Sequence, residues 1–235
     1  MSQNGQTPLL QVKGLKTYYP TDEGLVRAID GLSFDIYPGK TLGIVGESGC
    51  GKSTVGRSIL GILDKPGRVE EGSMVWRRDS GNGVIEETDL AQQKPNSARM
   101  RSIRGMEIAL VFQEPMTSFS PVHTIGNQLI EAIRLHLDMD KQEARERAVE
   151  LISRVGIPNP EQRLDEYSFQ LSGGLRQRAM IAMALSCEPK LLIADEPTTA
   201  LDVTTQAQIL DLLRELQDEN GMAIMLITHN LGVVA

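Results

Sequence analysis

Residues 46–53 read GESGCGKS and directly follow the apolar run TLGIV at 41–45. The octapeptide fits the pattern G-x-x-x-x-G-K-[ST], in which a glycine-rich loop joins a buried strand to a helix. Its glycines allow successive backbone N–H groups to turn inward around an anion, and the start of the helix adds a partial positive charge. Lys52 would reach the terminal phosphates of a nucleotide, and Ser53 would ligate Mg²⁺. The predicted phosphate contacts are Gly46, Glu47, Ser48, Gly49, Cys50, Gly51, Lys52, Ser53 and Thr54.

Apolar runs and helical periodicities alternate along the rest of the chain. Strands are expected at 9–15, 32–36, 41–45, 108–112, 191–194 and 223–227. The last four have almost no polar interruption, which is typical of strands buried on both faces of a parallel sheet. Helices are predicted at 141–155, where Gly156 follows as a C-cap, and at 203–220, between Asp202 as N-cap and Gly221. The alternation predicts an α/β fold.

Composition indicates an ordinary globular protein. Of 235 residues, 40% are hydrophobic and 23% are charged, which excludes disordered, collagen-like and coiled-coil chains. Lys and Arg number 24 against 31 Asp and Glu, for a net charge of −7. This balance argues against nucleic-acid binding as the main activity. The two cysteines, Cys50 and Cys187, are expected to be free thiols in a reducing compartment.

No segment resembles a leader, a membrane span or an interdomain linker. Residues 1–8 are polar and lack a secretory pattern, and the apolar segment 222–235 is shorter than the roughly 20 residues that cross a bilayer. Residues 77–102 are rich in Gly, Asn, Gln, Ser and charge, which predicts a turn-rich excursion or a flexible insertion.

A pair of acidic residues ends the apolar run at 191–194. Asp195 would hold Mg²⁺, and Glu196 would polarise an attacking water as a general base. Taken alone, such a pair is more often a helix cap. Together with the phosphate loop it indicates a nucleotide site, because ligands of open α/β sheets bind at the carboxyl ends of strands.

Residues 171–178 read LSGGLRQR and separate this sequence from other phosphate-loop proteins. They resemble the signature of ATP-binding-cassette ATPases, and the family's other motifs follow in the family's order. Gln113 resembles the Q-loop glutamine, residues 199–202 (TALD) resemble the D-loop, and His229 resembles the switch histidine. The resemblance covers nearly the whole chain.

The resemblance implies roles for these positions. Ser172, Gly173 and Gly174 would face the γ-phosphate bound by an opposite subunit, with Asp202 also at the nucleotide. A helix N-terminus with bare N–H groups suits such an anion site. A monomer would therefore hold only half of each catalytic centre, so a dimer is implied.

Four further positions complete the predicted site. By resemblance, His229 would contact the γ-phosphate and the attacking water, and Gln113 would connect Mg²⁺ and water to the surface that receives a membrane subunit. Tyr19 would stack on adenine, with Tyr18 as the alternative. The catalytic set is then Glu196, His229, Gln113 and Lys52, and the metal set is Ser53, Gln113 and Asp195.

The family fold implied is a phosphate-loop NTPase of the cassette type. It has a RecA-like parallel-sheet core, an antiparallel β subdomain and an α-helical subdomain. The whole chain, 1–235, would form one ATPase domain, with the core and β subdomain at about 1–112 and 188–235 and the helical subdomain at about 113–187.

Two segments, 112–118 (FQEPMTS, with Pro121 following) and 174–185 (GLRQRAMIAMAL), look like the ATPase subunits of oligopeptide and dipeptide importers. Nickel importers and some oligosaccharide importers share that grouping. The resemblance implies an ATP- and Mg²⁺-dependent ATPase that energises a membrane importer. Its partners would be a second cassette subunit, two transmembrane permease subunits and, indirectly, a substrate-binding protein, with no nucleic acid. The chain would be cytoplasmic and peripheral on the inner face of the cell membrane.

The sequence departs from the family at two places. Asn230 stands where an acidic residue commonly follows the histidine, and the chain ends at Ala235, where family members continue through another helix and an extension. We therefore expect a chain truncated at its C-terminus. The sequence leaves open which solute is transported and whether the dimer has two copies of this chain or two related chains. It also leaves open how the truncation arose and whether the missing segment carries a cysteine cluster.

Two other functions share part of this motif set. A soluble cassette ATPase acting on DNA or the ribosome shares the nucleotide chemistry, but usually shows a long coiled-coil insertion or tandem cassettes. A non-hydrolysing regulatory module would be expected to lack Glu196 or His229, and both are present. The motifs favour import.

Overall fold

The computed structural model describes residues 6–79, 84–113, 118–199 and 201–230. The chain divides into two compact units, which we call unit 1 (residues 1–104 and 223–235) and unit 2 (residues 105–222). Parallel and antiparallel strand pairs occur together with helices, which confirms the α/β prediction.

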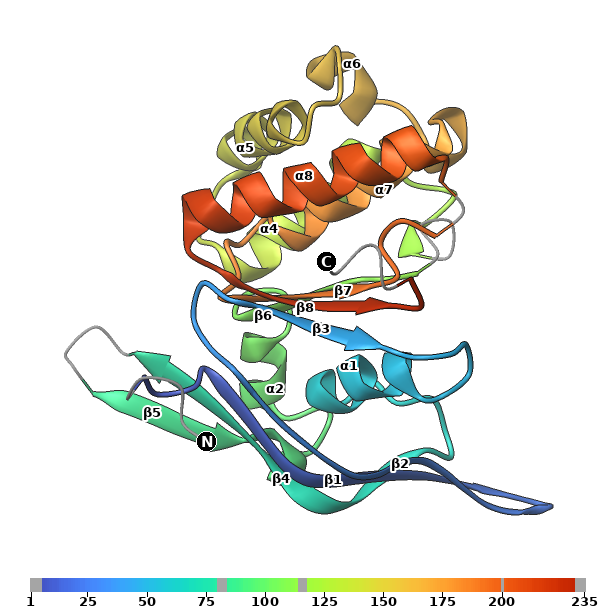
Figure 1. The fold of residues 1–235 in the computed structure, drawn as a ribbon. Coiled ribbons are helices and arrows are strands. Elements are labelled where there is room, and N and C mark those ends of the chain that lie inside the picture. The colour runs from blue at the N-terminus through green and yellow to red at the C-terminus, as the bar shows by residue number, and fades with distance from the viewer. Residues whose placement is uncertain (1–5, 80–83, 114–117, 200, 231–235) are drawn as a thin grey trace. The chain divides into compact units, whose positions relative to one another are not determined.

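Unit 1 combines an antiparallel sheet with a parallel strand pair (Figure 1). Its elements are β1 (Leu10–Thr21), β2 (Gly24–Ile36), β3 (Thr41–Val45), α1 (Lys52–Leu60), β4 (Arg68–Asp79), β5 (Ile85–Asp89), the 3₁₀ helix η1 (Leu90–Gln92), α2 (Ala98–Ile103) and β8 (Ala223–Thr228). The antiparallel order is β2-β1-β4-β5, and β3 pairs in parallel with β8.

Helix α1 lies over one face of the antiparallel sheet (Figure 1). Val55 and Ile59 of the helix are buried, as are Leu15 and Trp76 of the sheet. Burial of each such side chain contributes about 1.5–3 kcal/mol, so this layer forms a hydrophobic core of unit 1. A buried hydrogen bond of 2.9 Å between the hydroxyls of Thr17 and Ser58 ties β1 to the helix.

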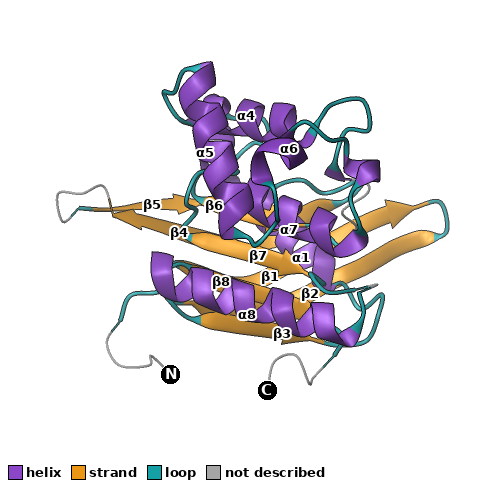
Figure 2. Cartoon of the chain, turned by 90° about the horizontal axis from the view of Figure 1, so that it is seen from above, coloured by secondary structure: helices purple, strands orange, loops and turns teal. Residues whose placement is uncertain are grey.

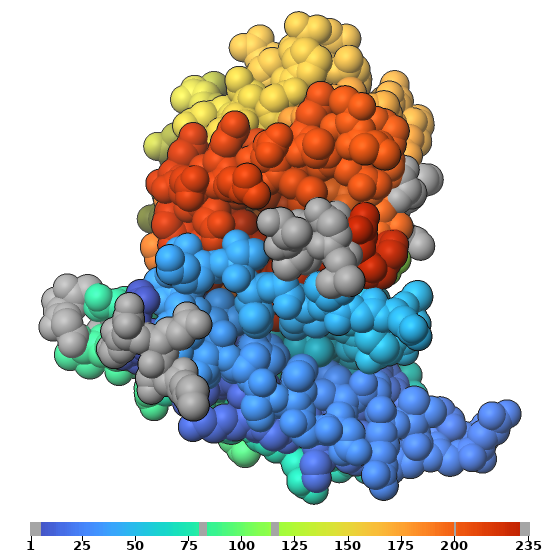
Figure 3. Space-filling model, viewed as in Figure 1, coloured from blue at the N-terminus to red at the C-terminus, as the bar shows by residue number. Residues whose placement is uncertain are grey.

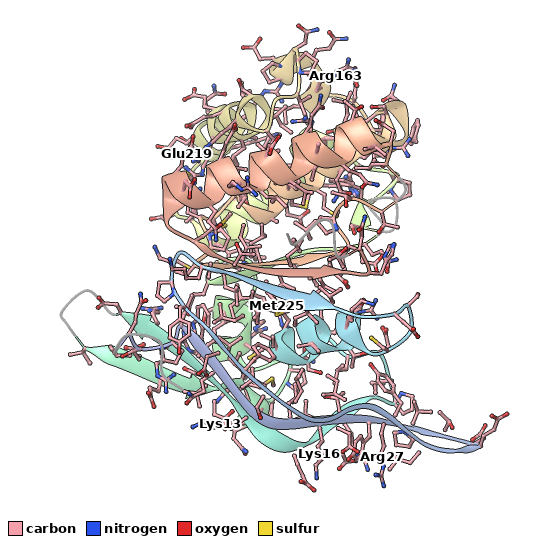
Figure 4. The ribbon with its side chains drawn as sticks, in the orientation of Figure 1. Lys13, Lys16, Arg27, Arg163, Glu219 and Met225 are labelled. Atoms are coloured by element: carbon pink, nitrogen blue, oxygen red, sulfur yellow. The ribbon has the colours of Figure 1, made fainter. Side chains whose placement is uncertain are left out.

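The opposite face of the antiparallel sheet is charged. Lys13, Lys16 and Arg27 project from it on the side away from α1 (Figure 4). Lys16 forms an ion pair of 2.7 Å with Glu71, and this contact raises the pKa of the lysine. The β1–β2 hairpin extends beyond the rest of unit 1 as an arm (Figure 3). One face of this sheet is therefore core and the other is solvated.

The prediction for 77–102 is wrong. The segment contains the end of β4, then β5, η1 and α2, while residues 80–83 lie outside the described part. β4 and β5 pair antiparallel, and an ion pair of 2.7 Å joins Arg77 to Glu87 across them. Cross-strand polar pairs stabilise a hairpin without the apolar alternation by which strands are identified in a sequence.

Unit 2 holds a parallel strand pair and most of the described helices. Its elements are β6 (Ile108–Val111), α4 (Ile125–His136), α5 (Lys141–Arg154), α6 (Pro160–Leu164), the 3₁₀ helix η2 (Ser168–Gln170), α7 (Gly173–Ala184), β7 (Leu191–Asp195) and α8 (Val203–Asn220). β6 pairs in parallel with β7. Helices α4, α5 and α6 pack together (Figure 2).

The predicted ends of α8 are confirmed. α8 begins after Asp202, whose carboxylate accepts the N–H of Thr205, and ends at Asn220, before the left-handed Gly221. α5 ends one residue earlier than expected, and Gly156 is also left-handed. The strands β6, β7 and β8 are buried as predicted, whereas β3 is only half-buried, with Val45 at its end exposed.

Candidate functional site

The predicted phosphate loop joins β3 to α1 in unit 1. Gly49 and Gly51 have φ of +82° and +91°, which side-chain-bearing residues rarely adopt. A Cβ at Gly51 would lie 2.2 Å from the carbonyl oxygen of Ala28 on β2. The loop thus needs glycine at residue 51 for both its conformation and its contact, and the N-terminus of α1 opens directly from it.

Lys52 begins α1 and its side chain folds back over the loop. The residue is 7% exposed, and its Nζ donates to the carbonyl oxygens of Gly46 (2.9 Å) and Glu47 (2.6 Å). Ser53, the predicted metal ligand, lies in the first turn of the same helix. The arrangement suits a phosphate chain, because N–H groups and an ammonium converge on a short loop at a helix N-terminus.

His229 lies at the same end of the parallel pair as this loop. In the pairing of β3 with β8, Val45 stands opposite Thr228, the last residues of the two strands. Gly46 and His229 therefore leave the pair together, at its carboxyl end. His229 is exposed, and the N–H of Asn230 donates to Oγ1 of Thr228 at 3.0 Å.

The two tyrosines proposed for adenine differ in their surroundings. The hydroxyl of Tyr18 donates to Asp30 at 2.7 Å, a bond that raises the pKa of the tyrosine, and Arg27 lies 5.7 Å from its ring centre. The ring of Tyr19 contacts Gly67 so closely that a Cβ there would come within 2.3 Å of it. Tyr18 is thus part of the charged face, and stacking by Tyr19 stays a prediction.

The acidic pair of unit 2 ends β7, and Gln113 follows β6. Val111 pairs with Ala194, so both strands deliver these side chains at their carboxyl ends. Nε2 of Gln113 donates to Oε2 of Glu196 at 3.2 Å. Asp195 is 6% and Glu196 is 8% exposed.

Glu196 has a backbone conformation that is rare for its residue type. Its φ is +46°, and the N–H of Thr199 closes a turn onto its carbonyl oxygen at 3.1 Å. The Thr199 hydroxyl also donates to Oε2 of Glu196, at 2.8 Å. Strained backbone at a buried acid is typical of functional sites. Thr199 was given no role of its own in the sequence analysis. The feature that could have identified it is a hydroxyl residue three positions after the acid.

The signature segment forms a helix N-terminus, as predicted. Ser172 caps α7 by accepting the N–H of Leu175 at 3.4 Å, and the helix begins at Gly173. A Cβ at Gly174 would lie 3.0 Å from Cγ2 of Thr205 on α8. The signature segment therefore lies against the start of α8 within unit 2.

Asp202 caps α8 with both of its carboxylate oxygens. Its carboxylate accepts the hydroxyl of Thr205 at 2.6 Å and the backbone N–H of the same residue at 3.0 Å. These hydrogen bonds lower the pKa of Asp202.

Three of the quoted segments lie partly outside the described residues, namely Ala200, residues 114–117 and the chain end at Ala235.

The structure therefore brings together three groups of predicted residues. In unit 1 these are the loop 46–54 and His229; in unit 2 they are Gln113 with Asp195 and Glu196, and the signature segment with the start of α8. Within the described part of the chain, no three His, Cys, Asp or Glu side chains cluster as metal ligands. Nor is any helix there long and apolar enough to cross a membrane.

Comparison with known proteins gives consistent results. The family described as "ABC transporter" matches residues 29–199. The chain is 52% identical over 229 residues to a putative peptide import ATP-binding protein of Brucella melitensis biotype 1, covering 97% of this chain and 66% of that protein. It is 48% identical over 227 residues to the dipeptide transport ATP-binding protein DppD of Escherichia coli K12, again covering 97% and 66%. The chain thus spans 66% of the length of these relatives.

A solved structure also resembles this fold. It is a dimeric structure of a post-hydrolysis state of the ATP-binding cassette MJ0796 bound to ADP and Pi. The TM-score is 0.80 at 26% identity, and the match covers 95% of this chain and 89% of that one.

Proposed function

The chain belongs to the ABC transporter family, and on that premise we propose that it binds and hydrolyses ATP to energise a membrane importer of di- or oligopeptides. The observation that carries the nucleotide chemistry is the loop from Gly46 to Ser53, with glycine required at residue 51 and Lys52 folded over it. The importer assignment is supported by relatives named for peptide and dipeptide transport.

In unit 1, the loop and Lys52 would hold the phosphate chain. Backbone N–H groups and the lysine ammonium stabilise negative charge that grows on the transferred phosphoryl group. Lys52 would exchange its present carbonyl partners, Gly46 and Glu47, for phosphate oxygens. His229 leaves the same end of the strand pair and would contact the γ-phosphate.

In unit 2, Glu196 would orient and deprotonate the attacking water. A general base must lie within hydrogen-bond reach of the proton that it removes, in a fixed orientation. Gln113 and Thr199 both donate to Oε2 of Glu196, which supports such an orientation. Mg²⁺ would be held by Ser53, Gln113 and Asp195, and when bound it would neutralise phosphate charge.

The remaining parts of the proposal concern organisation and partners. Residues 113–187 would be the helical subdomain, since α4, α5, α6 and α7 all fall within them. The signature segment 172–174, with Asp202, would meet the nucleotide of a second cassette subunit, and the dimeric cassette of similar fold supports this. Two membrane permeases and a peptide-binding protein would complete the importer, with this chain on the cytoplasmic face of the membrane. No observation favours action on DNA or the ribosome.

The test is the mass in solution of Glu196→Gln, measured by light scattering with and without ATP and Mg²⁺. We expect this variant to bind ATP, to hydrolyse it very slowly and to change from monomer to dimer. Lys52→Ala in the same background is the matched control and should stay monomeric, because it lacks the phosphate contact. Undiminished turnover by Glu196→Gln would remove Glu196 from the general-base role. ATP binding without dimer formation would contradict a homodimeric site for this chain.

A further inference from the structure

We propose that Thr199 is the positioning residue of Glu196, holding the carboxylate in place through hydrolysis. The inference rests on the proposed function, because it concerns the same catalytic acid. It adds a residue for which neither the motifs nor the comparisons give a role.

The geometry of the turn carries the argument. Glu196 has φ +46° and begins a turn that the N–H of Thr199 closes at 3.1 Å. Pro197 occupies the second position of this turn, where its ring fixes the backbone. The hydroxyl of Thr199 therefore returns to the acid from a rigid frame, and it reaches Oε2 at 2.8 Å.

The frame is also anchored on its far side. Asp202 caps α8 three residues after Thr199, through two bonds to Thr205. Thr199 is half-buried, and Thr198 before it is buried. A hydroxyl held by the turn from Glu196 to Thr199 loses little entropy on bonding, so it can define one rotamer of a flexible glutamate.

The second donor to Glu196 differs from Thr199 in kind. Gln113 reaches the same oxygen at 3.2 Å from an exposed position, and the proposed function assigns its amide to Mg²⁺ and water. Mg²⁺ would bind Gln113 through Oε1, so the position of the donating Nε2 depends on how the metal holds the amide. The hydroxyl of Thr199 has no metal to follow in the proposal, so its bond to Glu196 is independent of the metal during the chemical step.

The test compares steady-state ATP hydrolysis by the full chain carrying Thr199→Val or Thr199→Ser. Valine removes the donor and keeps the shape, so kcat should fall about tenfold, as for other residues that orient a reacting group, with KM within about twofold. Serine restores the hydroxyl and should keep kcat within about twofold of the parent. Thr204→Val is the matched control, an exposed threonine in the first turn of α8.

A double variant separates positioning from a general structural effect. In the Glu196→Gln background, Thr199→Val should slow single-turnover hydrolysis no further, since residues that act as a unit are not additive. A further tenfold loss there, or a tenfold rise in KM in place of the fall in kcat, would overturn the inference. If Thr199→Val does not fold, Thr199→Ala is measured in its place.

The two proposals fail differently. Full activity of Glu196→Gln would refute the general-base role of the proposed function. Loss of activity in Glu196→Gln together with normal kcat in Thr199→Val would leave that role intact and refute the positioning role of Thr199 alone.

Discussion

Replacing Gly51 by alanine tests whether the close approach of the phosphate loop to β2 matters energetically. A Cβ at Gly51 would lie 2.2 Å from the carbonyl oxygen of Ala28, and side-chain carbons essentially never come closer than 3.0 Å. The loop or the strand would therefore have to move by at least 0.8 Å, the difference between the two distances. Gly49 provides a matched control, because its φ is also positive, +82°, while a Cβ there meets nothing within 4 Å.

The expected loss in the free energy of unfolding has two parts, the left-handed backbone conformation and the close approach to Ala28. A left-handed conformation costs a residue with a side chain about 1–2 kcal/mol, and both variants carry that cost. Both also gain about 0.4–1 kcal/mol from the stiffer unfolded chain. Gly51→Ala alone carries overpacking, which costs about 1–3 kcal/mol more. Gly51→Ala should therefore be less stable than Gly49→Ala by about 1–3 kcal/mol.

Urea unfolding without nucleotide measures this difference. Trp76 is the only tryptophan of the chain, lies 1% exposed on β4, and so reports the unfolding of unit 1 by fluorescence. Affinity for a fluorescent ATP analogue should also fall in Gly51→Ala, since the displaced loop moves its N–H donors. Equal unfolding midpoints for the two variants would refute the argument from close approach.

Two further predictions concern unit 2. Asp140→Ala should lower the free energy of unfolding by about 1 kcal/mol, because Asp140 accepts the N–H groups of Gln142 and Glu143 at the start of α5. Asp140→Asn should keep most of that stability, since asparagine also caps helices. Circular dichroism in urea measures both variants, and equal losses would contradict a capping role. Burial lowers the pKa of His136 from its ordinary 6.5, so the unfolded chain takes up the proton first and stability should fall as the pH drops below about 6.5. His136→Gln should weaken that dependence in melting temperatures taken at about pH 7.5 and 5.5, and an unchanged slope would exclude this histidine as its source.

The features that the sequence predicted correctly are local ones. The glycine-rich loop between β3 and α1, the cap of α8 at Asp202 and the glycine after that helix each depend on a few neighbouring residues, whose conformational preferences decide the outcome. The strand runs at 108–112, 191–194 and 223–227 were found because burial leaves a continuous apolar signal.

The features that the sequence did not reveal depend on distant partners. The hairpin of β4 and β5 is polar, and its pairing of Arg77 with Glu87 appears only once the strands are aligned. The bond from Gln113 to Glu196 joins residues 83 positions apart. Motifs indicate that Gln113 and Glu196 matter. Only the fold shows that Gln113 and Thr199 donate to the same oxygen, Oε2 of Glu196.

The parallel pair of unit 1 has a consequence for biosynthesis. β3 is complete at Val45, yet its partner β8 begins at Ala223, and all of unit 2 is encoded between them. At about 5–20 residues per second, a ribosome needs roughly 9–35 seconds to make that interval. During this time the nascent chain carries a phosphate loop whose supporting strand still lacks β8. The edge of β3 that pairs with β8 therefore stays open until unit 2 has been translated, and slower translation of unit 2 would lengthen that interval.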